Sequence, residues 1–159
     1  MEKELRRSRD KLVIAGTGFC IFGLWGIIKT VMDFILNREE IKETLNVSGA
    51  MMILIFAVTL FIMLIVVALH LFVGFSARSE GLYCKKHIVY LIFAVIMGLF
   101  YILSIASAFQ DLIIDDFHLL QFIVSVMMNL TAVITIAEII IESVKSKRLS
   151  KRLAEQESV

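Results

Sequence analysis

The chain has 159 residues, of which 59% are hydrophobic, and its formal net charge is only +1. Because soluble domains are nearer to about half apolar, this composition excludes an ordinary soluble protein and indicates a membrane protein. The two cysteines lie on different segments and form no Cys-x-x-Cys motif, so neither a thiol redox pair nor a stabilising disulfide is expected.

Four long apolar stretches follow a charged lead over residues 1–11. A helix of about 20 apolar residues crosses the hydrocarbon core of a bilayer, and each stretch is at least that long. The first is read as a retained span, because it is too long for a signal peptide and shows no convincing cleavage site. The sequence predicts spans over residues 12–36, 47–76, 87–110 and 117–144, and a basic cytoplasmic tail over 145–159.

The distribution of positive charge predicts the orientation. Thirteen of the sixteen Lys and Arg residues lie in residues 1–11, in the connecting segment 77–86 and in the tail. Arg38 and Lys42 are the only two expected on the other side, and positive charge is retained in the cytoplasm. Both termini are therefore expected to be cytoplasmic.

The predicted fold is all-α: an integral membrane, up-down antiparallel four-helix transmembrane bundle. The segments between the spans are too short to form a soluble domain, so residues 1–159 constitute a single membrane domain. The chain contains no Pro, which favours continuous rather than broken helices.

Small residues form a stripe on the first span. Gly16, Cys20 and Gly23 share one helix face, and Gly26 lies close beside it. Small residues allow helices to approach closely in lipid, so this stripe predicts a tight helix crossing, within the protomer or between protomers. The alternative is a backbone surface that lines a permeation path.

Lys29 and Asp33 form a candidate charge pair near the outer end of the first span. Their i,i+4 spacing allows them to pair, and the lysine stem can also extend to the membrane interface. The simpler interpretation is an interfacial anchor. The other is a charge that faces an outward cavity and binds an anionic group.

A candidate intramembrane polar site combines His70 on the second span with Glu138 and Thr135 on the fourth. His70 and Glu138 are predicted at similar depth, and a contact would reduce the cost of a carboxylate in hydrocarbon. Such a contact would either fix helix register or form a proton- or cation-coupled site. Alternatively, the two residues never meet. Tyr90 lies near the same level and either joins this network or is an ordinary interfacial aromatic residue.

The sequence shows no catalytic, metal-binding or nucleotide-binding motif, so we expect a non-enzymatic protein without cofactor or metal. We expect it to act in the cell membrane through association with lipid, with a second copy, or with another membrane protein. Its basic residues are explained by topology, so nucleic acid is not an expected partner. The alternative function is a small oligomeric transporter or channel that uses the His, Glu, Lys and Asp residues within the membrane.

Overall fold

The computed structural model describes residues 1–36, 49–83, 88–111 and 119–157. Within these ranges the chain is all-helical, and each of the helices is long and apolar enough to cross a membrane. The four helices are α1 (Glu2–Leu36), α3 (Gly49–Tyr83), α4 (Val89–Asp111) and α5 (Leu119–Glu157). These four candidate spans suggest a multi-pass membrane protein.

Three of the helices extend well beyond the predicted spans. α1 begins at Glu2, where Arg6 and Glu2 form an i,i+4 ion pair with a 3.2 Å separation. α3 continues to Tyr83, and α5 continues through the basic segment to Glu157. At about 1.5 Å per residue, helices of 35 to 39 residues reach over 50 Å. They therefore exceed the bilayer core of about 30 Å and must tilt or project from it.

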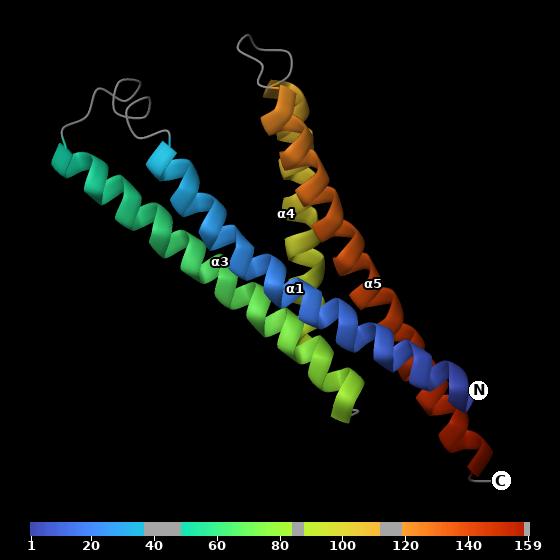
Figure 1. The fold of residues 1–159 in the computed structure, drawn as a ribbon. Coiled ribbons are helices and arrows are strands. Elements are labelled where there is room, and N and C mark those ends of the chain that lie inside the picture. Colours follow the sequence, from blue (N-terminus) through green and yellow to red (C-terminus); the bar gives the residue numbers. More distant parts are fainter. Residues whose placement is uncertain (37–48, 84–87, 112–118, 158–159) are drawn as a thin grey trace.

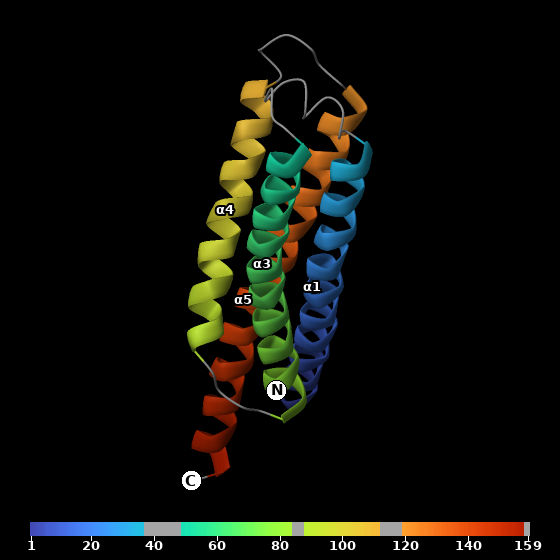
Figure 2. The same cartoon turned by 90° about the vertical axis from the view of Figure 1, so that its left-hand side faces the viewer.

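The helices are arranged as two pairs, α1 with α3 and α4 with α5 (Figure 1). The pairs approach one another near the end of the molecule that carries both termini. They diverge toward the other end, where α1 and α4 finish and α3 and α5 begin (Figure 1). In the perpendicular view the four helices run nearly parallel, so the divergence lies mainly in one plane (Figure 2).

Glycines bring α1 into close contact with α3. A Cβ placed on Gly16 would lie 2.6 Å from the carbonyl oxygen of Gly74, and one on Gly23 would lie 2.5 Å from the Cβ of His70. No side chain fits at such distances, so the two backbones meet directly. The residues predicted for helix packing lie on or beside this contact face: Gly16, Cys20, Gly23 and Gly26.

The core lies where the two pairs meet. All four helices contribute buried apolar side chains, and their largest members include Phe19 of α1, Tyr90 of α4 and Ile139 of α5. The complete cluster is Leu12, Ala15, Phe19, Val73, Ala77, Tyr90, Ala94, Met97, Ile136 and Ile139. The core therefore occupies the half of the molecule nearer the termini.

The α1 face that enters this core changes its environment along the helix. Its buried positions alternate in steps of three and four residues: Leu5, Ser8, Leu12, Ala15 and Phe19. The same periodicity continues through Phe22, Gly26 and Lys29, which are all partly exposed. One continuous helix face is thus buried near the termini and uncovered beyond the crossing.

The opposing faces of α4 and α5 change in the same way. On the α5 face that enters the core, the buried positions include Ser146, Ser143, Ile139, Ile136 and Ala132. The pattern then continues through Asn129 and Ser125, which are partly exposed. On α4, Tyr90, Ala94 and Met97 are buried, whereas Ser104 on the same face is exposed. We call these uncovered continuations of α1, α4 and α5 the diverging faces.

Candidate functional site

A buried carboxylate joins α3 to α4 and α5. Glu80 of α3 is 3% exposed and accepts hydrogen bonds from the Tyr90 hydroxyl and the Ser143 hydroxyl, each at 2.8 Å. The Lys147 ammonium lies 3.4 Å from the same carboxylate and 5.9 Å from the centre of the Tyr90 ring. Three helices therefore meet at one charged group, which has hydrogen-bond donors on two sides and a counter-ion.

A second buried carboxylate joins α1 to α5. Glu142 is 6% exposed, and the Ser8 hydroxyl donates to its carboxylate at 2.7 Å. The same hydroxyl lies 3.1 Å from the Glu142 carbonyl oxygen, and the Lys11 ammonium lies 3.3 Å from the carboxylate. Ser8 and Lys11 are three residues apart on α1, so they reach the glutamate from one helix face.

These two clusters hold helices together, because each one joins side chains of different helices. A carboxylate withdrawn from water costs several kcal/mol unless it is paired and hydrogen-bonded. Both glutamates have such partners, and the partners come from other helices. Among the residues that the structure describes, no three His, Cys, Asp or Glu side chains are grouped to hold a metal ion.

His70 occupies the level at which the helix pairs begin to separate. Its Nδ1 lies 2.7 Å from the Val66 carbonyl oxygen, and its Nε2 lies 2.6 Å from the Tyr101 hydroxyl. Because a carbonyl oxygen only accepts, the neutral ring carries its hydrogen on Nδ1 and accepts the tyrosine hydrogen at Nε2. Phe19 stacks on the imidazole with a centroid distance of 4.7 Å, and Phe22 lies beyond it.

The structure groups the predicted polar residues differently from the sequence hypothesis. His70 bonds to Tyr101 and Val66 rather than to Glu138, which is exposed on α5. Tyr90 donates to Glu80, and the Thr135 hydroxyl donates to the Thr131 carbonyl oxygen one turn earlier. The four residues therefore do not form one site. Glu138 is exposed even though it lies one helical turn from the buried Glu142.

Of the two residues in the predicted charge pair at the outer end of α1, the structure describes the side chain of only one. Lys29 is partly exposed and lies on the diverging face of α1. The side chain of Asp33 lies outside the described part of the structure, so the Lys29–Asp33 pair stays a prediction.

Sequence reasoning did not identify Glu80 and Ser8 as buried polar residues, because both were assigned to charged segments outside the spans. Both residues can be found when the helical spacing of the apolar positions is continued past the point where charged residues begin. On α3, His70, Val73, Ala77 and Glu80 continue one face in steps of three and four. Ser8 similarly continues the stripe of Leu12, Ala15 and Phe19 on α1. The apolar part of each helix ends at the membrane interface, whereas packing between the helices continues beyond it.

No protein-family model, curated protein or solved structure matches this chain.

Proposed function

We propose that this chain is a non-enzymatic, multi-pass protein of the cell membrane that acts by helix association with a membrane partner. In this proposal the four helices cross the bilayer in an up-down antiparallel order, with both termini in the cytoplasm. The positive charge of the lead, the 77–86 segment and the tail supports this orientation. The buried carboxylate clusters then lie near the cytoplasmic side.

One observation carries the proposal. Helix faces that are buried near the termini become partly or fully exposed beyond the crossing, although their helical periodicity continues. On α5 these exposed positions include the polar side chains of Ser125 and Asn129. Lipid tails cannot satisfy such polar groups, whereas a neighbouring helix can pack closely and hydrogen-bond to them. The partner is therefore a transmembrane helix seated against the diverging faces.

Site-specific photocrosslinking tests the proposal in native membranes. A photoreactive phenylalanine analogue is placed at Asn129, on the diverging face, or at Met127, which is 64% exposed on another face of α5. We expect a protein adduct of defined mass from position 129 and none from position 127. An adduct of twice the chain mass identifies a second copy as the partner. Equal adducts from both positions, or none from 129, would contradict the proposal.

The alternative function is a small oligomeric transporter or channel. It is favoured by the polar residues Lys29, Ser104 and Asn129, which lie on the diverging faces of three helices and are at least partly exposed. A liposome flux assay distinguishes the two functions. Solute- or pH-dependent flux that is lost in Lys29→Gln would support transport and displace the interaction proposal.

A further inference from the structure

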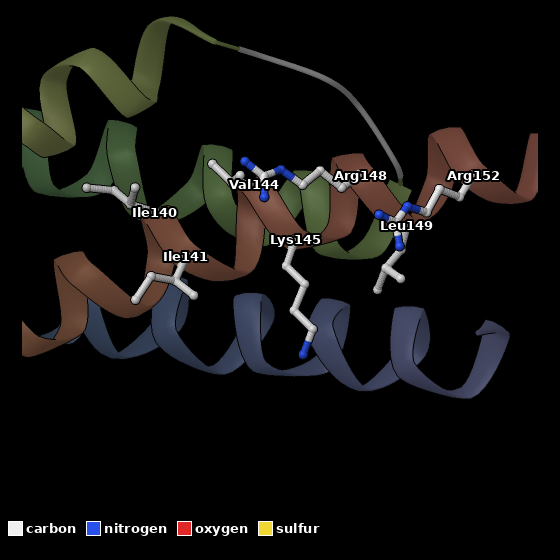
Figure 3. A pocket seen from close by; sticks show the side chains of 7 residues that line it. All are labelled: Ile140, Ile141, Val144, Lys145, Arg148, Leu149 and Arg152. Carbon is white, nitrogen blue, oxygen red and sulfur yellow. The ribbon is translucent and has the colours of Figure 1, made fainter.

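A shallow hollow lies on the outer surface of α5, at the end of the molecule that carries the termini. All of its lining residues come from this one helix (Figure 3): Ile140, Ile141, Val144, Lys145, Arg148, Leu149 and Arg152. Its lining surface is mostly apolar, and three cationic side chains border it. Arg148 and Arg152 extend back along the helix toward its apolar part (Figure 3).

The order of residues along α5 matches the order of groups in a phospholipid. The apolar residues Ile140, Ile141 and Val144 come first, on the side of the membrane interior. Lys145, Arg148 and Arg152 follow, toward the end where α5 projects beyond the other helices (Figure 1). The rise from Ile141 to Arg148 is about 10 Å, which separates an acyl contact from a headgroup contact along one helix face.

Two cations of the hollow, Arg148 and Arg152, are available for an external anion, whereas Lys145 extends toward α1 and acts electrostatically on the Glu142 carboxylate (Figure 3). Lys11 and Lys147 are bound to the buried glutamates, and Arg6 and Lys151 are bound to exposed carboxylates. Within the described ranges, no ion pair involves the three cations of the hollow: Lys145, Arg148 and Arg152. All three are exposed.

Retention of positive charge in the cytoplasm accounts for how many basic residues this end carries, but not for their placement around an apolar hollow. We propose that the hollow binds one anionic phospholipid in the leaflet nearest the termini. Its phosphate is held by Arg148 and Arg152, since guanidinium groups present paired donors to phosphate oxygens. Its first acyl segment lies along Ile141 and Val144. The inference rests on the membrane insertion proposed above but not on the partner helix.

Native mass spectrometry of the full chain in detergent tests the site, with phosphatidylglycerol as probe and phosphatidylcholine at equal concentration as comparison. We expect one phosphatidylglycerol to bind preferentially to the natural chain. In the double variant Arg148→Gln, Arg152→Gln, we expect its Kd to rise by about 25-fold, since each basic residue near an anionic lipid contributes about fivefold. The single variant Arg148→Gln should show about a fivefold rise by the same reasoning, and it tests the site if the double variant does not fold.

The matched control removes the same charge at the same end of the molecule, away from the hollow. Lys3→Gln, Arg7→Gln should leave the Kd within about twofold, because screened charges outside the hollow contribute little. Equal loss in this control would show diffuse attraction and overturn the site. Equal binding of phosphatidylcholine, or displacement of the lipid by millimolar inorganic phosphate, would also overturn it. A missing crosslink at position 129 would leave this result unchanged.

Discussion

Glu138 and Glu142 lie one helical turn apart on α5, in opposite environments. Glu138 is exposed, whereas Glu142 is buried with the Ser8 hydroxyl and the Lys11 ammonium beside it. The two residues are chemically identical, so their difference isolates the effect of a partnered, buried carboxylate. The pair provides an internal control within a single helix.

We expect Glu142→Gln to lower the free energy of unfolding by about 1–3 kcal/mol, because hydrogen bonds and ion pairs to a charged group are lost in a desolvated position. Reversible unfolding in mixed detergent micelles measures this change. Glu138→Gln should stay within about 0.5 kcal/mol, as exposed substitutions usually do. Equal effects of the two substitutions would mean that the Ser8–Lys11–Glu142 cluster does not stabilise the fold.

At the residue scale, the sequence identified the polar residues within the apolar stretches but not their partners. His70 and Tyr90 are buried and hydrogen-bonded, yet to Tyr101 and Glu80 rather than to one another or to Glu138. Depth along a helix can be estimated from the distance to a charged flank. The rotation of one helix relative to its neighbours cannot, because it depends on packing between distant residues.

At the element scale, α1 and α3 are held at a separation that only glycine permits. Gly16 faces backbone atoms of α3, with the Gly74 carbonyl oxygen and the Arg78 nitrogen both within 3 Å of a Cβ added there. Backbone atoms within a helix cannot move aside as a flexible side chain can. Gly18, two residues along the same helix, has no heavy atom within 4 Å of an added Cβ.

Gly16→Ala should therefore force the helices apart and lower the free energy of unfolding by about 1–3 kcal/mol, in the range of overpacked cores. Gly18→Ala should be neutral or stabilising by up to about 1 kcal/mol, because alanine is the better helix former. Both changes can be measured by the same micelle unfolding assay. A stabilising Gly16→Ala would show that α1 and α3 do not pack through this contact.

The existence of all four helices could be predicted from hydropathy, because long apolar stretches allow few other structures in a bilayer. The end of α3 could not. The predicted second span ends at residue 76, whereas α3 continues to Tyr83 because Glu80 finds partners and Gly81 packs against Val13. Charge marks where a helix leaves hydrocarbon, and it does not mark where the helix stops.

At the scale of the whole molecule, the two helix pairs are joined at one end and separate at the other (Figure 1). The buried clusters of Glu80 and Glu142 and the apolar core lie on the joined side. The sequence could not predict this divergence, since the angle between helix pairs depends on which side chains interdigitate at the crossing.

Spin-label distance measurements test the divergence in lipid nanodiscs. With both native cysteines replaced by serine, one label pair is placed at Met32 and Ile123 near the diverging ends, and another at Arg7 and Lys145 near the termini. All four positions are exposed. We expect a longer mean distance for the first pair, because α1 and α5 separate toward that end. Equal means would show that the pairs run parallel in the bilayer.

Both buried carboxylates depend on α5, which is synthesised after α1, α3 and α4. Ser143 and Lys147 of α5 are partners of Glu80, and Glu142 belongs to α5 itself. Until the ribosome has delivered this helix, the earlier part of the chain holds Glu80 without its α5 partners and Ser8 and Lys11 without their glutamate. Completion of the bundle is thereby tied to the synthesis of α5. A product truncated before α5 would carry unsatisfied polar groups that membrane quality control can recognise.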